Sequence, residues 1–244
     1  MSSIDIKDLY VKYINRKETV DVLKGLNAHF DDGTINTICG YSGCGKTTLL
    51  KTIIGLNDYD GEILFDNIDS NSLTIGEKNL AYVSQNYTLF PHLTIFDNIA
   101  NPLKMNKVPR EEIIKRVYEV SEILGIKDLL TRKPRHLSGG QQQKVAIAKA
   151  LIKKPRVYLF DEPLSNLDYK GRAEARIIIK KVIRLYNSTA IYVTHDFNEA
   201  MSIADKIFIL NNGVIEIEGA PLEIFNSNNE TVESLRQESL NEEI

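Results

Sequence analysis

The sequence predicts an α/β fold in which a largely parallel sheet is covered by helices. Short apolar runs with strand character alternate along the chain with longer segments of helical periodicity, as parallel strands joined by helical crossovers do. Residues 94–152 show helical periodicity almost throughout. We therefore expect the sheet domain to carry an inserted helical subdomain.

The first expected elements are antiparallel strands at residues 4–13 and 20–30, followed by further strand material at 62–65 before the turn at Asp66 and Asn67. The parallel strands are expected at 35–39, 81–83, 157–160 and 190–193. In the helical block, residues 109–125 and 139–152 predict two helices. Residues 169–186 predict an amphipathic helix. The segment after Phe225, rich in Asn, Ser and Glu, predicts a frayed polar helix or disorder.

Composition excludes several classes of protein. The 244 residues, 26% charged and 43% hydrophobic, suffice for one large domain or one domain with an insertion. A net charge of −3 gives no global attraction to nucleic acid or anionic lipid. We find no secretory signal peptide and no apolar run of about 18 residues, which predicts a cytoplasmic protein. Cys39 and Cys44 have no further metal ligands nearby and are expected to be free thiols.

The clearest chemical motif is the glycine-rich loop at residues 40–47, which fits the P-loop spacing G-x-x-x-x-G-K-[ST] and leads into an expected helix at 48–54. Glycines let backbone N–H groups turn toward a phosphate, and the helix N-terminus adds partial positive charge. We expect Lys46 to reach the β- and γ-phosphates and Thr47 to bind Mg²⁺. Cys44 is expected to fill space. The predicted nucleotide-binding residues of this loop are Gly40, Ser42, Gly43, Cys44, Gly45, Lys46, Thr47 and Thr48.

Two carboxylates end the predicted strand 157–160. The tip of a buried parallel strand lies at the carboxyl edge of the sheet, where the phosphates are expected. Asp161 would therefore hold Mg²⁺ through water, and Glu162 could act as general base on the attacking water. An isolated acidic pair is more often a solvated turn, but the P-loop favours the catalytic interpretation.

A second candidate anion site is Leu-Ser-Gly-Gly-Gln at residues 137–141. A serine and two glycines at a helix start can bind an anion, although an isolated Ser-Gly-Gly is more often a helix N-cap. The string resembles the signature motif of the ABC-type ATPases. The resemblance implies a head-to-tail dimer in which this loop closes over the nucleotide held by the other subunit's P-loop. The residues implied are Ser138, Gly139, Gly140 and Gln141.

Further ABC motifs follow in the family's order. Gln85 is similar to the lid glutamine that contacts Mg²⁺ and the attacking water, and residues 165–168 resemble the loop that communicates across the dimer. His195 resembles the switch histidine that touches the γ-phosphate. Tyr13 occupies the place of the aromatic residue that stacks on adenine, with Tyr10 nearby as the alternative.

The resemblance, which extends over about residues 4–225, implies a RecA-like P-loop NTPase core with an antiparallel β subdomain and an inserted α-helical subdomain. The core is expected at about 1–84 and 157–225, the helical subdomain at about 85–156, and a polar tail at 226–244. Catalysis is expected from Lys46, Glu162, Gln85 and His195, with ATP as nucleotide. Mg²⁺ would be held by Thr47, Gln85 and Asp161.

The implied function is to energise transport of a solute across a membrane by ATP-driven dimer closure. Residues 89–99 and 164–168 resemble importers of sugars, polyamines, iron or phosphonates. The expected partners are a second ABC ATPase subunit, in a homodimer, permease subunits bound in a groove near Asn86–Thr94, and a solute-binding protein outside the cytoplasm. The chain would lie on the inner face of the cell membrane.

Two departures from the family pattern stand out. Gln142, Lys144 and Lys149 occupy positions where the family commonly has arginine, so contacts there are expected to be less directional. The chain also ends soon after Phe225, without room for the β-rich regulatory domain of many sugar and polyamine importers. The substrate is therefore left open.

Three alternatives remain at this stage. A soluble ABC-type ATPase of DNA maintenance would need a long coiled coil or a basic patch, and neither is evident, so no nucleic-acid partner is expected. A nucleotide-dependent regulatory module would lack a catalytic group, whereas Glu162 and His195 are present. A GTPase would need Asn-Lys-x-Asp, and residues 106–109 lack the acid.

Overall fold

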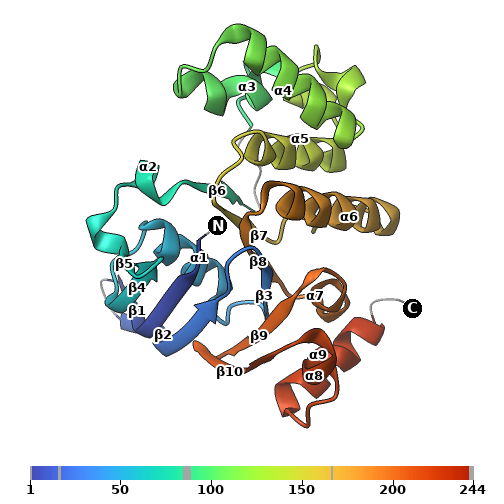
Figure 1. The fold of residues 1–244 in the computed structure, drawn as a ribbon. Helices are drawn as coiled ribbons and strands as arrows, with labels where there is room; N and C mark the ends of the chain where they lie inside the picture. The colour runs from blue at the N-terminus through green and yellow to red at the C-terminus, as the bar shows by residue number, and fades with distance from the viewer. Residues whose placement is uncertain (1, 16–17, 85–88, 166, 242–244) are drawn as a thin grey trace.

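The structure is a computed structural model, and it describes residues 2–15, 18–84, 89–165 and 167–241. Its strands are β1 (Ile4–Asn15), β2 (Glu18–Phe30), β3 (Ile35–Cys39), β4 (Asp60–Phe65), β5 (Ile68–Asp69), β6 (Leu80–Val83), β7 (Val157–Asp161), β8 (Thr189–Thr194), β9 (Lys206–Asn211) and β10 (Val214–Gly219). They form one sheet in the order β10-β9-β3-β8-β7-β6 and a second in the order β2-β1-β4-β5. The two sheets lie together in Figure 1, and a group of helices stands apart from them.

The larger sheet contains the four parallel strands that the sequence predicts, each within two residues of the expected bounds. β3, β7 and β8 are buried at every position, as strands covered on both faces must be. β3 pairs in parallel with both β8 and β9, and β7 lies between β8 and β6. The carboxyl ends of β3, β8 and β7 therefore meet side by side at one edge of the sheet.

The hairpin of β9 and β10 is an element that the sequence analysis missed. Its signal was present, because Asn212 and Gly213 separate two apolar, strand-like runs and both adopt positive φ (48° and 85°), as a two-residue hairpin turn requires. A Cβ at Gly213 would lie 2.2 Å from the Val22 carbonyl oxygen. Only glycine permits this close approach of the hairpin to β2.

The smaller sheet is antiparallel, as predicted, and its β1 pairs with β2 and β4. The helices are α1 (Lys46–Ile54), α2 (Ile75–Lys78), α3 (Ile95–Met105), α4 (Arg110–Ile123), α5 (Gly139–Leu151), α6 (Tyr169–Tyr186), α7 (Phe197–Ile203), α8 (Pro221–Phe225) and α9 (Glu230–Asn241). α3, α4 and α5 form the group at the top of Figure 1, which is the helical block that the sequence predicts.

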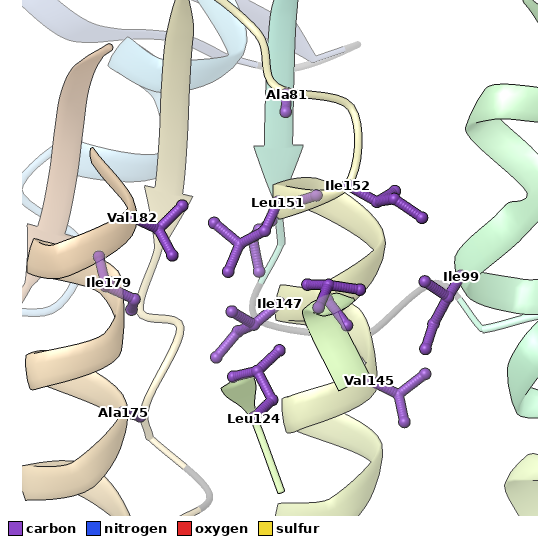
Figure 2. Close-up of a cluster of buried hydrophobic side chains, with 14 of the residues drawn as sticks. Ala81, Ile99, Leu124, Val145, Ile147, Leu151, Ile152, Ala175, Ile179 and Val182 are labelled. Atoms are coloured by element: carbon purple, nitrogen blue, oxygen red, sulfur yellow. The ribbon is translucent and has the colours of Figure 1, made fainter. Parts of the chain in front are cut away.

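A continuous apolar core connects this helical block to the larger sheet. In Figure 2, Ile147 and Leu151 of α5 lie between that helix and α6, which contributes Ile179 and Val182. Ile99 of α3 approaches α5 from the other side. α5 is thus packed on two sides. Because the core is close-packed, a displacement of α5 would also displace α6 and the sheet behind it.

The tail differs from the expectation of a frayed polar helix or disorder. Residues 230–241 form α9, and Val232 and Leu235 are buried in a cluster with Phe197 of α7 and Ile209 of β9. The hydroxyl oxygen of Ser239 accepts a hydrogen bond from the Phe197 backbone N–H at 3.2 Å. Two apolar residues three positions apart lie on one helical face, which is enough to dock an otherwise polar helix.

Candidate active site

The candidate site lies where the carboxyl ends of β3, β8 and β7 meet. The loop after β3 leads into α1, Asp161 ends β7 and Glu162 follows it, and His195 follows β8. Strand order thus brings three segments that are distant in the sequence to one edge. A hollow of about 370 Å³ opens there, lined by Val22, Ser42, Gly43, Gly45, Lys46, Thr47, Thr48 and Glu162.

The loop backbone has the geometry that its glycines predict. Gly43 and Gly45 adopt φ of 83° and 114°, and Gly45 is also the N-cap of α1, without a side-chain hydrogen bond to the helix. The Lys46 ammonium is buried and donates to the carbonyl oxygens of Gly40 (2.7 Å) and Tyr41 (2.8 Å). The N-terminus of α1 and the Lys46 ammonium therefore lie together at this loop, and this arrangement suits the binding of an anion.

Cys44 behaves as the space-filling residue that the sequence predicts. Its side chain packs against the apolar cluster beneath the loop. Burial raises the pKa of the thiol, and the nearby Lys46 charge opposes that shift. Burial likewise raises the pKa of the Cys39 thiol to about 12. Both side chains are thus protonated at neutral pH, and the thiolate required for nucleophilic or redox chemistry is disfavoured.

Asp161 is 3% exposed and is held by two hydroxyl groups. Thr47 Oγ1 lies 2.8 Å from Asp161 Oδ1, and the Tyr82 hydroxyl donates to Oδ2 at 2.9 Å. Burial, followed by the Asp161 charge, raises the pKa of Tyr82, so the phenol keeps its proton. Tyr82 is a site residue that sequence reasoning missed. The available signal was a hydroxyl-bearing side chain within the apolar strand next to β7.

The oxygen atoms of Thr47 and Asp161 fit a hard cation such as Mg²⁺. Within the described ranges, no cluster of three or more His, Cys, Asp or Glu side chains could hold a metal ion by itself. Mg²⁺ commonly binds through one or two protein groups together with substrate phosphates. The donor set therefore fits a magnesium ion that arrives with a nucleotide.

Glu162 and His195 form the second polar pair of the site. His195 Nδ1 lies 3.1 Å from Glu162 Oε1. That hydrogen bond, and then the charges of His195 and Lys46, hold the pKa of the Glu162 carboxyl below its usual value despite burial. The carboxylate is therefore ionised at neutral pH. The sequence placed both residues at the same phosphate, but their direct contact was not predicted.

The signature segment lies outside this hollow. Ser138 caps α5 by accepting from the Gln141 N–H (3.3 Å), and the Gln141 side chain accepts from the Ser138 N–H (3.1 Å). This reciprocal capping box satisfies the helix start. Ser138 and Gly139 are exposed, and Ser138, Gly140 and Gln141 line a separate hollow of about 770 Å³. One chain therefore has two candidate phosphate-binding surfaces that do not meet.

Of the remaining predicted residues, Tyr13 and Thr48 lie within the described part of the chain, whereas others do not. Tyr13 is 40% exposed and its hydroxyl donates to Asn57 Oδ1 at 3.4 Å. Thr48 lines the hollow, as expected. Gln85, residues 86–88 of the predicted permease groove and Asn166 of the 165–168 loop lie outside the described residues. Across the parts of the chain that the structure describes, we find no helix with the length and apolar character needed to span a bilayer.

Comparison with protein families and curated proteins gives consistent matches. Residues 23–165 match the family model described as ABC transporter. The chain is 43% identical to the sn-glycerol-3-phosphate import ATP-binding protein UgpC of Psychromonas ingrahamii, over 93% of this chain and 60% of that protein. It is 46% identical to the trehalose/maltose import ATP-binding protein MalK of Thermococcus litoralis, over 84% and 57% respectively. The chain thus spans about three fifths of the length of these relatives.

Comparison with solved structures confirms the predicted fold class. The dimeric structure of MJ0796, described as a bacterial ABC transporter cassette, matches with a TM-score of 0.82 and 33% identity, over 89% of this chain and 98% of that one. A second dimeric structure of MJ0796, described as a post-hydrolysis state bound to ADP and Pi, matches equally well. The larger sheet, the antiparallel β sheet and the helical block together form this cassette fold.

Proposed function

Since this chain belongs to the ABC transporter family, we propose that it is the ATP-binding and ATP-hydrolysing subunit of a membrane importer. The observation that carries the proposal is the convergence at one sheet edge of the P-loop Lys46, the Thr47–Asp161 pair and the Glu162–His195 pair. These groups supply phosphate binding, cation binding and a base, which are the parts that phosphoryl transfer to water requires.

Each side chain has a role that its surroundings support. The loop N–H groups and Lys46 would bind the phosphates, while Thr47 and Asp161 would hold Mg²⁺, which neutralises charge on the phosphates when bound. Tyr82 keeps Asp161 oriented. Glu162, ionised and aimed by His195, would accept a hydrogen bond from the attacking water. Tyr13 would stack on adenine, and Gln85 would contact the cation and the water.

The two separate phosphate-binding surfaces support a head-to-tail dimer. Ser138, Gly139, Gly140 and Gln141 of one subunit would cover the nucleotide held by the P-loop of the other. Both MJ0796 structures are dimeric. We propose a homodimer that closes on two nucleotides and opens after hydrolysis, with residues of about 85–156 moving as the helical subdomain and the RecA-like core formed by about 1–84 and 157–225.

The permease subunits would bind beside residues 86–94. A groove of about 330 Å³ lies between β6, the end of α3 and α5, and Ser84, shortly before this segment in the sequence, is among its lining residues. Met105 at its rim is 76% exposed, and Pro102 and Ala146 add apolar surface. Such a groove suits a short amphipathic helix of a partner. The chain would then lie in the cytoplasm, on the inner face of the cell membrane.

The names of the relatives narrow the substrate class. UgpC and MalK are named for import of sn-glycerol-3-phosphate and of trehalose or maltose. We propose import of a small hydroxylated solute of this kind, delivered by a solute-binding protein outside the cytoplasm. The cargo itself would contact the permease and the binding protein rather than this chain.

The test is Glu162→Gln. We expect the variant to bind Mg·ATP as the wild type does and to hydrolyse it at least about 100-fold more slowly, because the base is lost while the binding groups remain. It should also form a more stable ATP-dependent dimer. Turnover and size-exclusion chromatography with Mg·ATP measure both effects, and an unchanged turnover rate would refute the role of Glu162.

The same variant tests the transporter assignment. A tagged form is expressed in its native host, membranes are solubilised gently with Mg·ATP, and copurifying proteins are identified. Recovery of membrane-spanning subunits would support the importer. Recovery of only soluble DNA-associated partners would favour a DNA-maintenance ATPase and leave the ATPase assignment intact.

A further inference from the structure

Four consecutive polar residues at the start of α5 contact four different parts of the structure. Gln141 closes the capping box with Ser138. Gln142 donates to the carbonyl oxygens of Pro134 and Leu137 in the preceding segment. Gln143 donates to the carbonyl oxygen of Pro163, and Lys144 pairs with Glu174 of α6. Of the four, Gln143 is the one that reaches the turn containing Glu162.

Gln143 is 1% exposed, and its side-chain oxygen has no hydrogen-bond partner among the described residues. A buried amide with one unsatisfied oxygen costs stability, and an apolar side chain of the same size would avoid that cost. Packing alone therefore gives no reason for a glutamine here. The hydrogen bond to Pro163 is what distinguishes Gln143 from an apolar residue.

The turn that Gln143 contacts holds Glu162 in an uncommon conformation. Glu162 has a φ of 47°, which a non-glycine residue keeps only where its surroundings hold it. Within the turn, the Glu162 carbonyl accepts from the N–H and hydroxyl of Ser165, and the Leu164 carbonyl accepts from the Leu167 N–H. The Pro163 carbonyl instead accepts the hydrogen bond from the Gln143 side chain of α5.

Gln143 also lies on the face of α5 that packs inward. Ile147 and Leu151, one and two turns further on, occupy the same helical stripe and face α6 (Figure 2). A rotation or shift of α5 that began at Ser138 would thus move the Gln143 amide relative to the sheet edge. Because that amide holds Pro163, the movement would reach the neighbouring Glu162 carboxylate.

We propose that Gln143 is a positioning residue that makes the orientation of Glu162 depend on occupancy of the signature segment at Ser138. The inference rests on the proposed function, because only in the proposed dimer does the partner's nucleotide lie at Ser138. Nucleotide bound at one P-loop would then set the catalytic carboxylate of the other subunit through Ser138, α5, Gln143 and Pro163. The two ATP sites would hydrolyse cooperatively.

The test compares wild type, Gln143→Met and Gln237→Met in the full chain. Methionine keeps the volume of glutamine and removes the amide, so Gln143→Met should fold, and Gln143→Leu gives a second apolar replacement. We expect kcat to fall about five- to tenfold in both Gln143 variants, with ATP affinity within about twofold of wild type. The Hill coefficient for ATP should fall to 1 from a wild-type value above 1.

Gln237→Met, which removes the same amide from an exposed position of α9, should keep both the kcat and the Hill coefficient of wild type. An equal loss in Gln237→Met, or unchanged kinetics in Gln143→Met, would overturn the role of Gln143. A wild-type Hill coefficient of 1 would overturn the coupling. Absence of wild-type turnover would instead overturn the proposed function and this inference with it.

Discussion

At the residue scale, the site depends on two neighbouring carboxylates in different surroundings. Asp161 still belongs to β7 and is buried between the hydroxyl groups of Thr47 and Tyr82. Glu162 leaves the strand in a left-handed conformation and meets His195. The proposed cation ligand and the proposed base are thus adjacent residues whose side chains have different partners. The sequence predicts that the pair lies at this edge, whereas the partners come from α1, from β6 and from the residue after β8.

Tyr82→Phe should lower the apparent affinity of the protein for Mg²⁺. Loss of a hydrogen bond to a carboxylate costs about 1.5–3 kcal/mol, so we expect the Mg²⁺ concentration for half-maximal ATPase activity to rise on the order of tenfold. Titration of turnover with Mg²⁺ at saturating ATP measures this. Tyr158→Phe, on β7 but hydrogen-bonded to the Leu151 carbonyl, is the control. Equal Mg²⁺ dependence in wild type and Tyr82→Phe would show that Tyr82 does not orient Asp161.

At the element scale, short helices and their caps hold the catalytic edge in place. α7 begins directly after His195 and Asp196, and Asp196 caps it by accepting from the Glu199 N–H at 2.9 Å. Inside the fold, the Glu199 carboxyl is hydrogen-bonded to the Tyr192 hydroxyl of β8. α9 adds the Ser239 contact at the start of α7. The position of His195 therefore depends on packing among β8, α7 and α9.

Glu199→Gln should stabilise the protein at alkaline pH. Burial raises the pKa of Glu199 above its usual value, so the folded protein binds this proton more tightly than the unfolded chain. The contribution of the group is fully present at low pH and is lost as pH rises through the raised pKa. Glutamine does not ionise and avoids that loss. We expect a Tm gain of a few degrees at pH 8.5, at about 2–4 °C per kcal/mol, that shrinks toward pH 5.

Thermal melts at several pH values measure the effect. Glu119→Gln, on the exposed face of α4, is the matched control and should change Tm little at any pH. A Tm gain for Glu199→Gln that does not vary with pH would mean that ionisation of Glu199 is not its cause.

At the scale of the whole molecule, the two candidate phosphate-binding surfaces of one chain lie apart. The P-loop hollow and the hollow beside Ser138 are lined by different residues. A symmetric dimer can bring two such surfaces together twice, because the same pair of patches meets at each of two equivalent positions. The proposed ATP dependence of dimerisation follows from this geometry, since the nucleotide would be the shared ligand of both subunits.

The double variant Glu162→Gln/Ser138→Arg tests this arrangement. An arginine at Ser138 removes the cap oxygen and adds bulk where the partner's nucleotide would lie. We expect the double variant to bind Mg·ATP with the affinity of Glu162→Gln, because its own P-loop is intact, but to remain monomeric. Size-exclusion chromatography with Mg·ATP measures the difference.

The control is Glu162→Gln/Ser72→Arg, which changes an exposed serine of the four-stranded sheet region and should dimerise as Glu162→Gln does. An ATP-dependent dimer of the Ser138 double variant would exclude the signature segment from the interface.

The sequence by itself determined the fold class, the parallel strands and the candidate site residues of the P-loop, Asp161, Glu162 and His195. The strands, the P-loop and the acidic pair follow from local rules, since strand burial, helical periodicity and the spacing of a phosphate-binding loop are all set by neighbouring residues. His195 was identified through its resemblance to the switch histidine of the ABC-type ATPases. The Asn-Gly hairpin at 212–213 was equally local and was overlooked. The docked helix α9 was not predictable from a local pattern, because its docking depends on an apolar surface assembled from β9 and α7.

Only the tertiary structure decided which side chains meet. Tyr82 reaches Asp161 because β6 lies beside β7, and His195 reaches Glu162 because β8 lies on the other side of β7. Gln143 contacts Pro163 because α5 packs back onto the sheet edge. Strand order and helix packing are long-range consequences of burying one shared core, and no local pattern in the sequence specifies them.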